Sequence, residues 1–259
     1  MPVTEKNTSY SFTMTTDQLA TFLKKVKDLV AIDSRIILRI DNQSILMFSF
    51  VGESFKNIHA FKNYIFDREE IMGVKKEITD PIIFISKDGK KLYRTLNNLI
   101  DYEEEIKGKI SINDEDYVNY FSFNNDRMDI KIIGSDPISI GKEIGIDDVN
   151  YLMNTENSLF NFELGAQDFA KIKKMGLIEN EPNSVLYLNI DNKKLSIGET
   201  KWHLNICEIE DIDDTMMIFP KKYFNTINPL EVIKIYVFET FILCKYDDYN
   251  LMILMETSI

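Results

Sequence analysis

The chain has 259 residues, of which 42 are acidic and 30 basic, so its formal net charge is -12. Its 44% hydrophobic content suits one large or two ordinary globular domains. It has no run of about 18 apolar residues, and its N-terminus, MPVTEKNTSYSF, lacks a hydrophobic signal region, so we expect a cytoplasmic protein without membrane insertion. The two cysteines and two histidines are scattered, which argues against disulfide frameworks and zinc sites. The net charge argues against a simple nucleic-acid coat, because phosphate binding needs a cationic surface.

The first predicted helix, Asp17 to Leu29, combines an apolar stripe with a cluster of lysines. Its apolar residues recur at helical spacing at Leu19, Phe22, Leu23, Val26 and Val30. Lys24, Lys25 and Lys27 belong to the same segment. The spacing predicts an amphipathic helix with a basic side.

A second amphipathic helix is predicted over SKDGKKLYRTLNNLI, Ser86 to Ile100. Its bases stand at i, i+3, i+4 and i+7, which is one stripe on a helix, and they are Lys87, Lys90, Lys91 and Arg94. Leucines fall on the opposite side. No acid interrupts the stripe, and three of the bases lie near the helix N-terminus, where the helix dipole disfavours cations. The pattern indicates an anion outside the chain as the compensating partner.

Two further segments carry clustered bases: Ala166 to Met175, with Lys171, Lys173 and Lys174, and Pro220 to Thr226, with Lys221 and Lys222. The four basic segments together hold 12 bases and four acids, so they carry +8 and the rest of the chain carries -20. One such cluster is ordinarily a solvated helix face. Four clusters at related positions favour a shared role.

The chain also repeats itself. Three pairs of segments match: FTMTTDQLATFLKK (Phe12 to Lys25) with FELGAQDFAKIKKM (Phe162 to Met175), IILRIDNQSILM (Ile36 to Met47) with LYLNIDNKKLSI (Leu186 to Ile197), and DPIIFISK (Asp80 to Lys87) with DTMMIFPK (Asp214 to Lys221). The first two pairs share an offset of 150 and the third has an offset of 134, so the first copy carries 16 extra residues. The pattern indicates a duplicated architecture.

Each copy is predicted to form a strand, a helix, several strands, a second helix and a meander of three strands. This order is typical of an α+β fold with mostly antiparallel sheet. We expect a first domain over residues 1–134, a connector rich in Gly, Asp and Asn over 135–158, and a second domain over 159–259.

With these features, nearly the whole chain resembles the sliding DNA clamps of the proliferating-cell-nuclear-antigen and bacteriophage type. Size, the two copies and the order of elements agree. The connector segment EIGIDDVNY, Glu143 to Tyr151, is similar to the family's Leu-Gly-Ile pattern with a tyrosine five residues after its isoleucine. Asp147 stands where the family usually has proline.

The resemblance implies that three two-domain subunits close into a homotrimeric ring, with helices on its inner wall and paired sheet edges between subunits. Such a ring encircles double-stranded DNA regardless of sequence, tethers a DNA polymerase, is loaded by an ATP-driven clamp loader and needs no cofactor of its own. A phage-encoded clamp would act in the cytoplasm of a bacterial host. The DNA-facing residues implied in this way are Lys24, Lys25, Lys27, Lys87, Lys90, Lys91, Arg94, Lys171, Lys173, Lys174, Lys221 and Lys222.

The resemblance also implies a groove for partner peptides at the connector and near the C-terminus. Its candidate residues are Ile144, Ile146, Tyr151 and, more loosely, Met255. Ordinary packing of a linker against a sheet explains the same residues equally well.

Three alternatives remain open at this level. A monomeric or dimeric processivity factor could grip DNA without encircling it, and an acidic chain could mimic DNA. A metal-dependent hydrolase could use the acidic segments Tyr102 to Glu105 and Glu210 to Asp214, although neither has the spacing of a calcium loop. No constellation of catalytic residues stands out, so we expect a protein that is not an enzyme.

Overall fold

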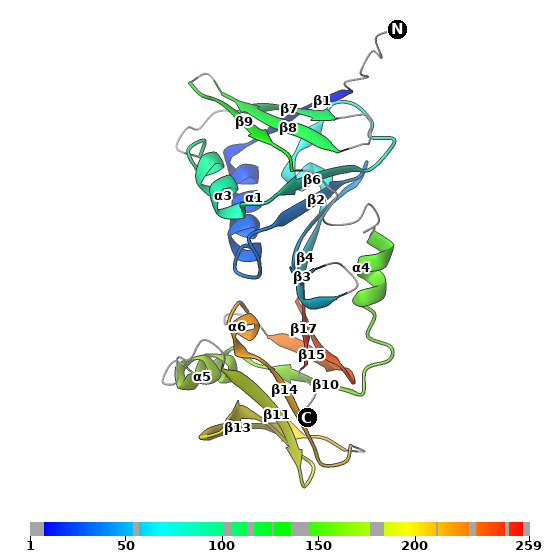
Figure 1. Cartoon of the computed structure of the whole chain (residues 1–259), viewed down its shortest axis with the longest axis vertical. Helices are drawn as coiled ribbons and strands as arrows, with labels where there is room; N and C mark the ends of the chain where they lie inside the picture. Colours follow the sequence, from blue (N-terminus) through cyan, green and yellow to red (C-terminus); the bar gives the residue numbers. More distant parts are fainter. Residues whose placement is uncertain are drawn as a thin grey trace. The chain divides into compact units, whose positions relative to one another are not determined.

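The computed structural model describes residues 8–53, 57–100, 105–112, 117–125, 127–135, 146–176, 184–210, 212–227, 232–246 and 249–255. The chain divides into two compact units. The first is Met1–Asn57 with Lys62–Ile146, and the second is Ile58–Phe61 with Asp147–Ile259. Figure 1 labels most of their helices and strands.

The N-terminal half is built from two antiparallel arrangements of strands. Its elements are β1 (Ser9–Met14), α1 (Thr16–Leu29), β2 (Ile36–Ile40), β3 (Ser44–Gly52), β4 (Ile58–Asp67), α2 (Arg68–Ile71), β5 (Gly73–Val74), β6 (Ile82–Ser86), α3 (Gly89–Asn97), β7 (Ile106–Ile112), β8 (Val118–Asn124) and β9 (Asp129–Ile133). One sheet has the order β5-β1-β7-β8-β9, while β4, β3, β2 and β6 are neighbours in that order.

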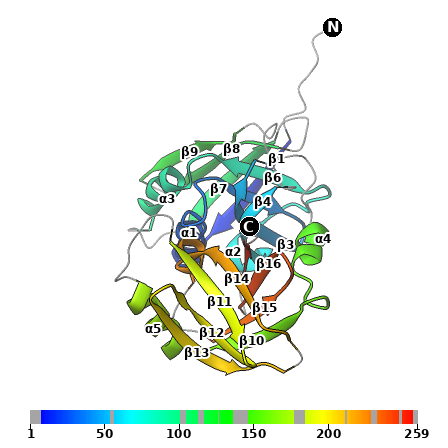
Figure 2. The ribbon, with the colours of Figure 1, turned by 60° about the horizontal axis from the view of Figure 1, so that its bottom comes forward.

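The C-terminal half repeats this plan. Its elements are β10 (Phe160–Leu164), α5 (Ala166–Gly176), β11 (Val185–Asp191), β12 (Lys194–Glu199), β13 (Trp202–Glu208), β14 (Thr215–Pro220), α6 (Lys221–Phe224), β15 (Ile233–Val237), β16 (Phe241–Lys245) and β17 (Tyr249–Leu254). The strand orders are β10-β15-β16-β17 and β13-β12-β11-β14. In this unit α5 packs on β12 and β13 (Figure 2).

The two halves share one topology, which confirms the predicted α+β class and the internal repeat. In each half the first strand pairs with the first strand of the closing meander, β1 with β7 and β10 with β15. In each half the next strand pairs on both sides, β2 with β3 and β6, and β11 with β12 and β14. The extra length of the first copy contains α2 and β5, which have no counterpart among the described residues of the second half.

Helix α1 forms where the apolar spacing predicts it. Thr15 accepts a hydrogen bond from the Gln18 backbone N–H, and the Gln18 side chain accepts one from the Thr15 N–H, so the N-terminus is capped in both directions. The predicted apolar stripe is buried, except that Leu29 rather than Val30 completes it. Its polar side is left for the lysines.

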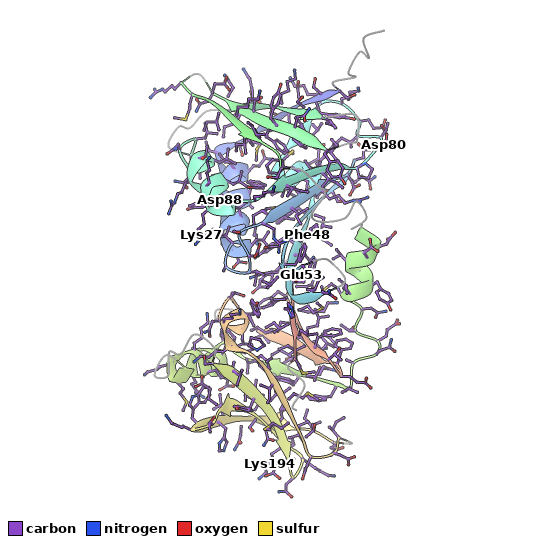
Figure 3. All side chains as sticks on the ribbon, in the orientation of Figure 1. Lys27, Phe48, Glu53, Asp80, Asp88 and Lys194 are labelled. Atoms are coloured by element: carbon purple, nitrogen blue, oxygen red, sulfur yellow. The ribbon has the colours of Figure 1, made fainter. Side chains whose placement is uncertain are left out.

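Helix α3 is shorter than predicted. It spans Gly89–Asn97 rather than Ser86 to Ile100, because Asp88 caps it by accepting a hydrogen bond from the Lys91 N–H at 2.9 Å. Ser86 still belongs to strand β6, where it pairs with Ile36. Lys87 therefore precedes the helix, and only three of the four predicted bases lie on it. Figure 3 labels Asp88 at the beginning of α3.

The second helix of the second copy, in segment Pro220 to Thr226, is the single turn α6, with Pro220 at its N-cap position. The connector contains the short helix α4 (Ile146–Leu152), which was not predicted because the segment has no clear period. None of the described helices is long and apolar enough to span a membrane.

Gly89 lets α3 begin directly against the end of α1. A Cβ at this position would lie 2.6 Å from side-chain carbons of both Val30 and Ile36, and the Gly89 N–H donates to the Ser34 carbonyl at 2.7 Å. Gly165 lies before α5, and a Cβ there would meet nothing within 4 Å.

We predict that Gly89→Ala lowers the free energy of unfolding by about 1 to 3 kcal/mol through overpacking. Gly165→Ala is the matched control and should change it by less than about 1 kcal/mol. Urea denaturation of both variants measures this. An equal change in the free energy of unfolding for both variants would contradict the role of Gly89 in the close packing of α3.

Candidate nucleic-acid interface

The lysines of α1 lie on its solvent side. Lys24 and Lys27 are exposed, and Figure 3 labels Lys27 on this helix. Lys25 is half-buried, with its Nζ 4.5 Å from the centre of the Tyr64 ring, so its stem and charge pack on an aromatic side chain. The helix therefore presents two exposed bases and a third that is half-buried.

The bases of α3 form the clearest cationic surface in the first unit. Lys87, Lys90, Lys91 and Arg94 are all exposed, and no carboxylate among the described residues lies within ion-pair distance of them. Asp88 is the nearest acid in sequence, and it accepts the capping hydrogen bond. As predicted, the stripe has no internal counter-charge.

Helices α1 and α3 pack against each other in the first unit (Figure 1), which brings their bases into one region. Leu92 and Leu96 of α3 are buried. With Phe22 of α1 they line a small apolar cavity of about 10 Å³. The apolar backs of both helices are held in one core, so their polar sides remain at the surface.

The bases of α5 in the second unit are less uniform. Lys171 is exposed and forms an ion pair with Asp168 at 2.9 Å, while Lys174 is exposed. Lys173 is half-buried and donates to the Ile227 carbonyl at 3.0 Å. Lys171 and Lys174 are thus the outward bases of this helix, whereas Lys173 connects it to the chain after α6.

Lys221 corrects the predicted DNA-facing set. Lys222 is exposed, but the Lys221 side chain is only 5% exposed, lies 2.6 Å from the Glu199 carboxylate and donates to the Gly176 carbonyl. Its charge is compensated inside the unit, so it is a structural residue. The sequence could not show this, because Glu199 reaches Lys221 only through the fold.

The connector residues can be placed in part. Ile144 lies outside the described residues, as does the side chain of Ile146. Tyr151 lies on α4 and is 83% exposed, which suits a contact surface. Met255 is buried after β17, and its N–H donates to the Thr240 carbonyl. Met255 is therefore a core residue and not an exposed lining of a groove.

The end of α4 is held by a cation that the sequence did not single out. Lys245 on β16 donates from Nζ to the Met153 carbonyl at 3.2 Å. Cations at a helix C-terminus satisfy carbonyls that lack helical partners. Lys245 therefore helps to fix the helix that presents Tyr151.

The acidic segments offer no support for a metal-dependent hydrolase. Among the described residues, no group of three or more His, Cys, Asp or Glu side chains could hold a metal ion. Residues 102–104 and 211 of the two acidic segments lie outside the described part. Burial raises the pKa of the Cys207 thiol, whereas a nucleophilic cysteine needs a lowered pKa.

Solved structures of bacterial DNA polymerase III β subunits share this architecture. A putative β subunit from Eubacterium rectale ATCC 33656 matches with a TM-score of 0.66 at 11% identity, covering 96% of this chain and 66% of that one. The β subunit from Borrelia burgdorferi in complex with a natural product matches with 0.63 at 15% identity, covering 96% and 65%. The Helicobacter pylori β clamp bound to a DNA ligase peptide matches with 0.62 at 12%, covering 96% and 67%.

The chain has the sliding-clamp fold. This confirms the resemblance at the level of fold. The chain spans about two thirds of the length of the Eubacterium and Borrelia proteins. No protein-family model matches it, and no curated protein matches its sequence. The sliding-clamp fold is thus visible in the arrangement of elements and not in residue identity.

The structural role of Lys221 gives a prediction for stability. We expect Glu199→Ala to lower the free energy of unfolding by about 3 kcal/mol, because it removes the carboxylate partner of a buried ammonium group. The double variant Glu199→Leu with Lys221→Met should recover most of that loss, because it removes both charges. Urea denaturation distinguishes the two. A double variant as unstable as Glu199→Ala would contradict the role assigned to the pair.

Proposed function

We propose that this protein is a sliding clamp, which encircles duplex DNA and tethers a replicative DNA polymerase as a processivity factor. The observation that carries the proposal is the exposed basic surface of α1 and α3, formed by Lys24, Lys27, Lys87, Lys90, Lys91 and Arg94, in an acidic protein with this fold. Exposed bases on α5 and α6, the corresponding helices of the second repeat, extend the same feature. The DNA-facing set proposed here is the predicted one without Lys221 and without Lys173, which is half-buried and donates to the Ile227 carbonyl.

The chemistry of these residues suits sliding better than tight binding. Lysine is a strongly hydrated point charge on a flexible stem, so it attracts phosphates without fixing a geometry. Contacts to phosphates carry no sequence information, and their strength falls steeply with salt. Such contacts permit movement along DNA, and a closed ring would prevent loss without strong affinity.

Ring closure is proposed to use β9 in the first unit and β13 in the second, which are edge strands among the described strands. Ile133 on β9 is 75% exposed. Unpaired edges of this kind invite strand addition. Pairing β9 of one copy with β13 of the next is a head-to-tail contact, which closes when the rotation between copies allows it.

The proposed partners follow the same role. A DNA polymerase and other replication proteins would dock at the connector, where Tyr151 is exposed. The Helicobacter pylori β clamp in the comparison binds a DNA ligase peptide, and a peptide site on this chain would be analogous. Opening the ring would require an ATP-driven clamp loader. The protein would act in the cytoplasm, as a homotrimer and without a cofactor.

The DNA assignment is tested by replacing Lys87, Lys90, Lys91 and Arg94 together with Ala. We expect the affinity for a fluorescein-labelled duplex to fall by about tenfold or more at low salt, and the dependence of affinity on salt to become shallower, because fewer counterions are released. Fluorescence anisotropy across a salt series measures both.

The matched control removes four other exposed lysines of the same unit, Lys75, Lys107, Lys109 and Lys131, which lie on strands or next to them. Its DNA affinity should stay within about twofold of the wild type if DNA binding depends on where the bases lie and not on the net charge of the protein. Equal losses in both variants would contradict a DNA-facing role for α3.

Ring assembly is tested by the solution mass. The chain is 30.3 kDa, so a homotrimer predicts about 90 kDa by light scattering. Ile133→Asp should shift the mass toward that of the monomer, because it puts a charge at the proposed edge contact, whereas Val232→Asp, at an apolar residue 62% exposed outside the strands, should not. A monomeric wild type over a range of concentrations would favour a protein that grips DNA without encircling it.

A further inference from the structure

A second cationic surface lies on the sheet of the first unit, away from the helices. Cross-strand pairing places Ser11 opposite Lys109, Lys109 opposite Ser122, and Ser122 opposite Lys131. The Lys75 N–H donates to the Ser11 carbonyl at 3.1 Å, which continues the row past β1. Lysine and serine thus alternate across the sheet. We call Lys75, Lys109 and Lys131 the lysine row.

The lysine row faces solvent. All three lysines are exposed, and so is Lys107, the next outward residue on β7. The residues that alternate with them along the strands, such as Ile110 on β7 and Ile130 on β9, are buried in the core. Because successive side chains of a strand point to opposite faces, the lysines stand on the outer face.

The basic helices lie on the other face of this sheet. Phe121 of β8 and Ile132 of β9 line the same small cavity as Phe22 of α1 and Leu92 of α3, so the core lies between the sheet and the two helices. DNA held against the helices therefore cannot neutralise the lysine row. Any partner of the lysine row is therefore a different molecule from DNA bound at α1 and α3.

Among the described residues, the outer face carries more lysines than acids. Asp129 and Glu105 are exposed acids toward the Lys107 end, Asp129 lies two residues before Lys131, and exposed Glu77 follows Lys75 by two residues. Within the described part of the chain, no carboxylate is within ion-pair distance of the lysine row. The face is cationic in a chain of net charge -12.

The spacing of the row suits an acidic helix. Neighbouring lysines of the row are two strands apart, which is about 10 Å between backbones. Carboxylates at every seventh position of a helix are also spaced by about 10.5 Å. The intervening Ser11 and Ser122 hydroxyls can donate to the same carboxylates.

A single nucleic-acid strand fits the face less well. Strands bound without sequence preference usually stack bases on aromatic side chains. Tyr120 is the aromatic residue on this face of β8, and Lys131 holds its Nζ 3.8 Å from the centre of the Tyr120 ring. The ring is therefore covered by a cation and not open to a base.

We propose that the lysine row, together with Lys107, is a docking surface for an acidic segment of a partner protein. The segment binds as a helix with its carboxylates in line across the strands. This surface lies on the face of the sheet opposite α1 and α3, so a partner held there leaves the DNA-facing helices of the first unit free.

The test uses a fluorescein-labelled helical peptide with glutamate at every seventh position, measured by fluorescence anisotropy at low salt. The triple variant Lys75→Ser, Lys109→Ser and Lys131→Ser should weaken binding of this peptide by about tenfold. Circular dichroism and thermal melting check that the variant is folded, which the exposure of all three lysines leads us to expect.

The matched control removes the same charge from the helical surface, with Lys87→Ser, Lys90→Ser and Lys91→Ser. It should keep peptide affinity within about twofold and lose duplex binding, so a failure of this inference is separate from a failure of the DNA assignment. Absence of peptide binding by the wild type, or equal losses in both triple variants, would overturn the proposal. Binding of a labelled oligothymidine that depends on the lysine row would overturn it in favour of a phosphate ligand.

Discussion

The proposed function depends on exposed cations on helices whose apolar sides are buried in the core. In α3 the leucines Leu92 and Leu96 are buried against α1, which leaves the bases of that helix at the surface. The nearby acid, Asp88, is engaged in capping and so does not neutralise them. Unpaired charges of one sign on a folded protein repel each other. An external anion is the simplest compensation, and the phosphates of DNA are the anions that we propose.

Each unit also contains a buried lysine that is paired with a carboxylate. Lysine therefore serves both as a buried structural residue and as an exposed surface charge. In the first unit, Lys62 is fully buried and lies 2.6 Å from the Asp28 carboxylate. In the second, Lys221 pairs with Glu199. Buried pairs of this kind fix local geometry more than they add stability. The charges that remain at the surface then divide between the helical faces and the outer face of one sheet.

The sequence predicted what depends on periodicity, and missed what depends on contacts between distant segments. The apolar spacing of α1, the repeat and the closing meanders were correct, because a buried stripe or an alternating strand has a local signature. The predicted beginning of α3 was wrong by three residues, because the helix begins at Gly89, directly after its N-cap residue Asp88. The prediction that Lys221 faces DNA was wrong, because its partner Glu199 lies on a strand that is distant in the sequence. The lysine row was missed, because its residues come from separate segments that only the sheet brings together.

The most direct measurement of the central claim is lysine footprinting, in which acetylation of each lysine is quantified by mass spectrometry with and without duplex DNA at low salt. The account predicts protection of Lys24, Lys27, Lys87, Lys90 and Lys91 together with Lys171, Lys174 and Lys222, and unchanged reactivity of Lys75, Lys109 and Lys131. Protection of the outer sheet face, or uniform protection of all exposed lysines, would contradict the assignment of the helices to DNA.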